Sequence, residues 1–284
     1  MSLLCEIAEV SRSGYYKHLH ADQKGHGDAE VARRIKKAQE EVLYTYGAKR
    51  MAKQLSATGS PPINHKRIAR VMRENMLNSR IRRRTHPEYY YRQKRLGFKI
   101  TDLRLAPNVL NREFTADTPV RKLVTDITVI PCTDGWLYLS AVMDLYNNEI
   151  IAYRHSKSIE TSLVTKTIND LAARYDVNGV LLHSDKGPTY RSYEYQDLLA
   201  SLGMIPSHSR TGNCWDNASM ESFFGHLKCE LGWANRIKKK PSSEKAIGGI
   251  DRYITFYNER RIQQRLGYRS PVGFRNNAAP VAGK

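Results

Sequence analysis

Cysteine and long apolar runs are both scarce in this sequence. Only four cysteines occur, at positions 5, 132, 214 and 229. They are too few and too widely spaced for a disulfide framework, and no two have the C-x-x-C spacing of a zinc site. No run of about 18 uncharged apolar residues is present, and residues 1–6 do not resemble a secretory signal. We therefore expect a cytoplasmic protein without a membrane span.

Acidic residues are scarce relative to basic ones. The 284 residues include 28 Asp and Glu against 46 Lys and Arg, a net charge of +18, which indicates an anionic partner. Apolar residues make up 40% of the chain. This is enough for packed cores and excludes a wholly disordered polybasic tail, and the length suits one large domain or two smaller ones.

The positive charge is concentrated in the first third of the chain. Residues 1–104 contain 23 basic and 10 acidic residues, whereas residues 105–284 contain 23 and 18. Between Lys66 and Lys99, 12 basic residues are interleaved with Tyr89, Tyr90 and Tyr91. Such a stretch attracts phosphate and can stack on exposed bases. The alternative is a solvated basic linker.

The N-terminal third has helical periodicity. Apolar residues recur at helical spacing from Val31 to Val42 and again from Ile68 to Met76, where Asn64 is a candidate N-cap. The second helix carries four basic residues on or near one polar face: Lys66, Arg67, Arg70 and Arg73. This pattern predicts a helix-turn-helix module that binds DNA. An ordinary amphipathic bundle helix would show the same periodicity.

From about residue 122 the pattern changes to β-branched and alternating segments. It predicts three consecutive strands and then alternating helices and strands, which is a mixed sheet with helices on its faces. The expected strands are 123–130, 136–144, 149–154, 179–183 and a short one near 205, and the expected helices are 162–175, 193–202 and 216–231.

Three carboxylates occupy positions that are unusual for acidic residues. Asp126 lies inside the first strand, Asp185 follows the fourth, and Glu221 lies on the late helix. Ligands bind near the strand ends of such a sheet, where a neighbouring helix can also contribute a side chain. Clustered carboxylates are suitable ligands for Mg²⁺ or Mn²⁺. The alternative is that the spacing arises by chance among many acidic residues. Asp144 can be merely structural, and Asp216 can be the N-cap of the Glu221 helix.

Several motifs then point to one family. Three segments resemble the D,D(35)E core of insertion sequence 3 family transposases, with 35 residues between Asp185 and Glu221. They are Thr125 to Thr128, His183 to Gly187, and Asn213 to Asn217, the last of which leads into Glu221, Phe223, Phe224 and Lys228. The tail segments 257–261 and 266–271, and segments 46–50 and 64–67 upstream, are also similar to that family. The resemblance covers nearly the whole chain and is to the product of the second reading frame, OrfB.

The resemblance implies a fold, a site and partners. The core would be α/β, a ribonuclease H-like mixed five-stranded sheet with flanking helices, preceded by a small all-α helix-turn-helix region. Asp126, Asp185 and Glu221 would hold two Mg²⁺ ions, for which Mn²⁺ may substitute. Lys228, Asn217 and Lys186 would contact DNA, and His183 would pack beside its strand. Phe223, Phe224 and Leu227 would form the core side of the helix.

The family also implies an organisation and a reaction. Residues 1–80 would form the helical DNA-binding region, 81–118 a basic linker, and 119–284 the catalytic core with a helical tail. The protein would bind terminal inverted repeats and target DNA, cut a phosphodiester and join the freed 3′-hydroxyl to another strand. It would work as a homo-oligomer on DNA, either fused to an upstream OrfA product or acting with it.

Three residues depart from the family pattern: Lys186 where Gln is usual, Leu123 where Trp is common, and Gln263 where His is common. None of these changes removes a carboxylate. Lys186 is the residue that keeps open an alternative function, a catalytically impaired DNA-binding remnant or regulator with the same fold.

Overall fold

A computed structural model describes residues 2–19, 21–57, 61–79, 105–210, 214–233 and 240–277. It divides into two compact units, residues 1–81 and 82–284. Of the predicted linker, residues 81–118, positions 81–104 lie outside the described residues, and these positions include Tyr89 to Tyr91. In the part of the chain that is described, no helix is both long enough and apolar enough to span a membrane.

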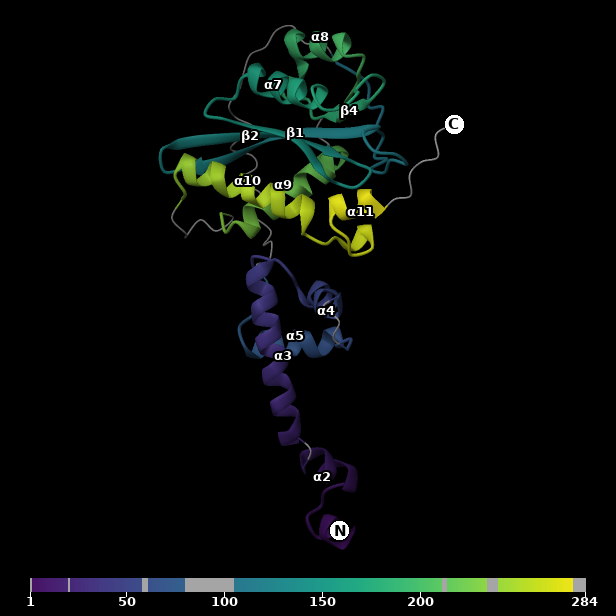
Figure 1. The fold of residues 1–284 in the computed structure, drawn as a ribbon, viewed down its shortest axis with the longest axis vertical. Helices are drawn as coiled ribbons and strands as arrows, with labels where there is room; N and C mark the ends of the chain where they lie inside the picture. The colour runs from purple at the N-terminus through teal and green to yellow at the C-terminus, as the bar shows by residue number, and fades with distance from the viewer. Residues whose placement is uncertain are drawn as a thin grey trace. The chain divides into compact units, whose positions relative to one another are not determined.

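The N-terminal unit is all helical (Figure 1). Three of its helices pack on one another, with Ile35, Met51 and Ile68 fully buried between them. The Asn64 side chain accepts a hydrogen bond from the Lys66 N–H at 2.8 Å, which confirms the predicted N-cap. The helices are α1 (Ser2–Ile7), α2 (Arg12–Leu19), α3 (Ala21–Glu41), α4 (Ala48–Ala57) and α5 (His65–Glu74).

The second unit contains the predicted mixed sheet of five strands, in the order β3-β2-β1-β4-β5 (Figure 1). Strands β1, β2 and β3 form an antiparallel meander, whereas β4 and β5 run parallel to β1. The fold class expected from the sequence is therefore confirmed. The strands are β1 (Lys122–Cys132), β2 (Gly135–Asp144), β3 (Ile150–Ser156), β4 (Leu181–Ser184) and β5 (Ile205–His208).

Helices cover both faces of this sheet, α7 and α8 on one and α9 and α10 on the other (Figure 1). The α7 face buries Leu123, Val142 and Ile168. On the other face, an aromatic group joins α9 to α10, with Phe223 and Tyr257 ring centroids 4.9 Å apart. The helices are α7 (Thr161–Ala172), α8 (Tyr193–Ser201), α9 (Ala218–Glu230), α10 (Ser243–Glu259) and α11 (Pro271–Asn277), with short 3₁₀ turns η1 (Pro188–Arg191), η2 (Cys214–Asn217) and η3 (Gln264–Leu266).

The chain before β1 is attached to the far edge of the sheet. The backbone N–H groups of Val109 and Leu110 donate to the Ser207 hydroxyl at 2.9 and 3.1 Å, and Ala106 N–H donates to His208 Nδ1 at 3.0 Å. Residues 105–113 therefore run beside β5, and they belong structurally to the sheet unit.

Candidate active site and DNA-binding surface

Two aspartates lie at the same level, one on β1 and one just beyond the end of its parallel neighbour β4. Val124 of β1 pairs with His183 of β4, and Asp126 and Asp185 each follow two residues later. Parallel strands lie about 4.8 Å apart, and side chains two residues apart point to the same face. The register of β1 and β4 therefore brings these two carboxylates side by side, just beyond the end of β4.

The third carboxylate is on the helix that covers this face. Leu123 and Ile127 pack on the α7 side of the sheet, so Asp126 between them points to the α9 side. Glu221 lies in the first turn of α9 and Lys228 in its last turn, about 10 Å along one helix face. Both are half-buried, while Phe223, Phe224 and Leu227 are buried in the core as expected from the sequence.

The pKa values of Asp126 and Asp185 are shifted by burial and by neighbouring groups. Burial, the charge of Asp185 and the charge of Glu221 raise the pKa of Asp126 well above its usual value, although the Ile127 N–H and the Lys228 ammonium oppose them. Burial also raises the pKa of Asp185, against the Gly187 N–H and the Arg191 guanidinium. As whole residues, Asp126 and Asp185 are half-buried.

The Lys228 side chain shares this environment. Burial lowers the pKa of Lys228 to about 8, while the neighbouring Asp126 carboxylate acts in the opposite direction. Lys228 and Asp126 are therefore near enough for their charges to interact. A partly desolvated ammonium in this place is suited to bind a phosphate oxygen.

The donor set fits a hard divalent ion. All three side chains offer carboxylate oxygens, and a dication would relieve both their repulsion and their burial. One oxygen of Asp126 accepts the Ile127 N–H at 2.8 Å and one of Asp185 accepts the Gly187 N–H at 2.7 Å. Within the described ranges, no three His, Cys, Asp or Glu side chains are arranged to hold a metal ion. Coordination by all three therefore requires these side chains to turn toward one another.

Two other residues singled out in the sequence are buried beside the site. Asn217 Nδ2 donates to the Thr125 carbonyl at 3.2 Å, which ties the start of α9 to β1 next to Asp126. His183 contacts the hydroxyls of Ser207 at 2.8 Å and Ser209 at 3.1 Å, and burial lowers its pKa to about 4. It is therefore a neutral packing residue, as interpreted. Lys186 is half-buried directly after Asp185.

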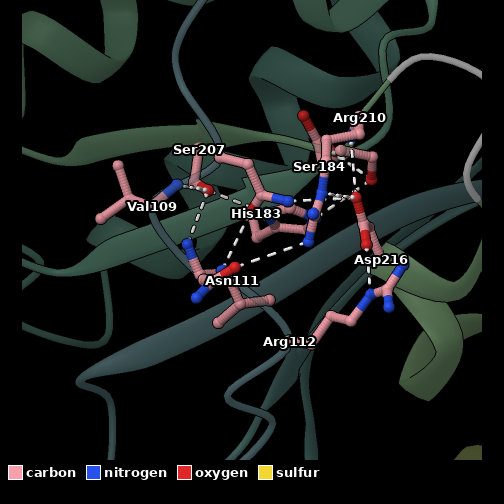
Figure 2. Close-up of polar contacts among 11 residues, drawn as sticks. Val109, Asn111, Arg112, His183, Ser184, Ser207, Arg210 and Asp216 are labelled. Carbon is pink, nitrogen blue, oxygen red and sulfur yellow. Dashed lines mark hydrogen bonds and ion pairs between the residues drawn. The ribbon is translucent and has the colours of Figure 1, made fainter.

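Asp216 is not the cap of the α9 helix, and this interpretation was wrong. The N-cap is Asn217, whereas the Asp216 carboxylate is fully buried and takes four hydrogen bonds (Figure 2). Arg112 Nε donates to Oδ1 at 2.8 Å, and Oδ2 accepts from Asn108 Nδ2 at 3.0 Å, from Arg210 N at 2.9 Å and from Arg210 Nε at 3.2 Å. Burial acts to raise its pKa, but these donors outweigh burial and lower it to about 2. Burying a carboxylate is costly unless it is paired with cations and hydrogen-bonded, so Asp216 is placed by these contacts and not by helix capping.

The predicted DNA-binding helix exposes its basic side chains. In α5 the residues Ile68, Val71 and Met72 are buried, and the opposite side exposes Lys66, Arg67, Arg70 and Arg73. Two of these are held by an acid from α3: Asp28 Oδ1 accepts from Arg67 Nε at 2.8 Å, and Oδ2 accepts from Arg70 Nη2 at 2.6 Å. The two guanidinium groups lower the pKa of Asp28.

Sequence reasoning missed an ion pair that fixes the far end of α9. Glu230 and Arg261 are both buried and joined by contacts of 2.6 to 3.2 Å, and the Tyr253 hydroxyl donates to Glu230 at 2.8 Å. A signal was available, because Glu230 lies seven residues after Phe223 on the apolar side of the helix. An acid on that side needs a buried cation, and the tail supplies Arg261.

The chain is similar to known proteins over most of its length. The sequence matches the family model described as an integrase core domain over residues 116–214, a second integrase core model over 202–271, and an HTH-like domain over 26–85. It is 35% identical, over 96% of this chain and 92% of the relative, to InsK for insertion sequence element IS150 of Escherichia coli strain K12. It is 30% identical, over 96% and 93%, to the transposase InsF for insertion sequence IS3A of the same organism. A chain in the simian T-cell lymphotropic virus intasome has the same fold, with a TM-score of 0.50 and 15% identity over 65% of this chain and 63% of that one.

Proposed function

This chain belongs to the insertion sequence 3 family of transposases, with an integrase core of ribonuclease H-like fold, and we propose that it cuts the ends of an insertion element and joins them to target DNA. The observation that carries this proposal is the shared level of Asp126 on β1 and Asp185 just beyond the end of β4, on the side of the helix that bears Glu221. The class of enzyme is a DDE-type polynucleotidyl transferase.

Each residue of the candidate active site would have its own role in the reaction. Asp126, Asp185 and Glu221 would hold two Mg²⁺ ions, or Mn²⁺ in their place. When bound, such a pair would activate a water or a 3′-hydroxyl and stabilise the leaving oxygen of a phosphodiester. Lys228, half-buried beside Asp126, would bind a phosphate oxygen near the cut. Asn217 would keep α9 and its Glu221 in register with β1 through the Thr125 carbonyl.

The N-terminal unit would bind the terminal inverted repeats. The exposed basic side of α5, with Lys66, Arg67, Arg70 and Arg73, supplies the charge that phosphates require. Two element ends must be brought together, so the working form would contain at least two copies of the chain. It would act on DNA in the cytoplasm, joined to an upstream OrfA product or acting with it.

The test is strand transfer on labelled inverted-repeat DNA with Mg²⁺ or Mn²⁺. We expect joined products from the wild type and none from Asp185→Asn, with DNA binding retained. Asp170→Asn is a matched control, because Asp170 is a partly exposed acid on α7 that pairs with Arg154. A wild type that cuts but never joins would instead indicate a simple nuclease.

A second function has one specific observation in its favour. Lys186 stands directly after Asp185, where an added cation can pair with a carboxylate and weaken metal binding. A wild type that binds DNA tightly but neither cuts nor joins with either metal would be a DNA-binding remnant or regulator. Lys186→Gln would then be expected to restore activity.

A further inference from the structure

One heavily bonded carboxylate of the described chain lies outside the proposed catalytic set. Asp216 is fully buried and accepts four hydrogen bonds, two of them from the guanidinium groups of Arg112 and Arg210. These arginines come from segments about a hundred residues apart and reach Asp216 from two sides (Figure 2). The cluster therefore joins the chain before β1 to the chain between β5 and α9.

The two arginines carry more charge than Asp216 requires. One guanidinium neutralises one carboxylate, and a second leaves a net positive charge at this place. Both side chains also remain well exposed, with 45% of the Arg112 surface and 52% of the Arg210 surface accessible. Each uses Nε toward Asp216, an interaction that fixes the plane of the guanidinium, and Arg210 Nη2 also donates to Asn111 Oδ1 at 3.5 Å.

The cluster is connected to the segments that carry Asp126 and Asp185. Ser184 of β4 pairs with His208 of β5, so Asp185 and Arg210 both lie just beyond the ends of adjacent parallel strands. Asp216 also directly precedes Asn217, which bonds to the Thr125 carbonyl next to Asp126. Arg210 and Asp185 therefore lie at the same end of neighbouring strands, and Asp216 connects Arg112 to Arg210 there.

We propose that Arg112 and Arg210, held in place by Asp216, bind a phosphate of the DNA backbone next to the reacting phosphodiester. A guanidinium held by its Nε presents planar N–H donors to a phosphate with little further loss of freedom. The cationic pair would guide the strand across the end of β5 toward Asp185. This inference rests on the proposed function, since it assumes that DNA lies over this surface.

The test is the salt dependence of DNA binding by the full chain. A short mixed-sequence duplex is titrated without divalent metal for the wild type, Arg112→Gln and Arg210→Gln. Each substitution should weaken binding by about tenfold and reduce the slope of log K against log salt by about 1. Arg154→Gln is the matched control, because Arg154 is also 45% exposed and paired with an acid, Asp170, and its affinity and slope should equal those of the wild type.

A second set of variants separates phosphate binding from simple neutralisation of Asp216. In an Asp216→Asn background no buried carboxylate is left bare, so Arg112→Gln and Arg210→Gln should fold, as checked by tryptophan fluorescence. If the arginines bind phosphate, each substitution still weakens DNA binding and lowers the slope in this background. If these substitutions no longer weaken DNA binding in the Asp216→Asn background, or weaken it only as much as Arg154→Gln does, the inference is overturned. Loss of strand transfer in Asp185→Asn would leave the proposed function standing in either case.

Discussion

The buried pair Glu230–Arg261 offers the sharpest test of how the catalytic helix is held. Arg261→Met keeps most of the volume of the side chain but shortens it and removes the cation that meets Glu230 at 2.6 Å. Both residues are buried, so the variant leaves a carboxylate that has lost its counter-charge, with the Tyr253 hydroxyl still donating to it. Removing one partner of such a pair costs about 3–5 kcal/mol.

This loss is large compared with the usual stability of a domain, about 5–15 kcal/mol. In a unit of this size it corresponds to a fall in Tm of about 6–20 °C. Unfolding of the sheet unit can be followed by tryptophan fluorescence, because Trp136, Trp215 and Trp233 all lie within residues 82–284. Strand transfer should fall at temperatures where the wild type still works, since α9 carries both Glu221 and Lys228.

A double variant tests the reasoning. In Glu230→Leu with Arg261→Met the buried charge is gone, and an apolar pair of similar volume often restores the stability. We expect it to recover more than half of the loss. The reasoning would be refuted by a loss below about 1 kcal/mol for Arg261→Met, or by a double variant no more stable than the single one.

Three further predictions concern other parts of the molecule. Because the folded-state pKa of Asp216 is lowered from 3.8 to about 2, its ionised form should stabilise the fold by about 2 kcal/mol above pH 3.8. Acid unfolding curves should show this contribution disappear as the pH falls toward 2 and should lack it in Asp216→Asn. Asp28→Asn should tighten binding to mixed-sequence DNA and steepen its salt dependence, because the carboxylate no longer competes with phosphate for two arginines. The substitution should lower the free energy of unfolding by less than about 1 kcal/mol. An unchanged slope of log K against log salt would contradict this. Gly203→Ala should destabilise the fold by about 1–3 kcal/mol, and by more than Gly179→Ala in urea unfolding, since both glycines have positive φ but only at Gly203 would a Cβ clash with the Asn178 side chain.

The sequence predicted the sheet well because its patterns are local. The β-branched run around Asp126 and the alternation after Trp136 are patterns of period two. The structure extends the first strand by one residue at its start and two at its end, and the second by one residue at its start. The α9 helix was expected from residue 216, but it begins at Ala218 after a 3₁₀ turn. The difference follows from Asp216, whose burial among arginines is set by contacts distant in sequence.

The candidate site was predicted in part. Its three carboxylates were identified from strand position and from family motifs, and the register of β1 with β4 supplies the physical reason for two of them. Arg112 was not anticipated as a partner of Asp216, because no local pattern connects residues 104 positions apart. The pairing of Arg67 with Asp28 was also unforeseen, since it depends on how α3 packs against α5.

The central claim is that Asp126, Asp185 and Glu221 act together as ligands for divalent metal. The most direct measurement is Mn²⁺ binding to the full chain with inverted-repeat DNA, followed by electron paramagnetic resonance. The wild type should bind two ions, and Asp126→Asn, Asp185→Asn and Glu221→Gln should each weaken binding, whereas Asp170→Asn should bind as the wild type does. Mn²⁺ binding that is the same in all four variants and the wild type would contradict the claim.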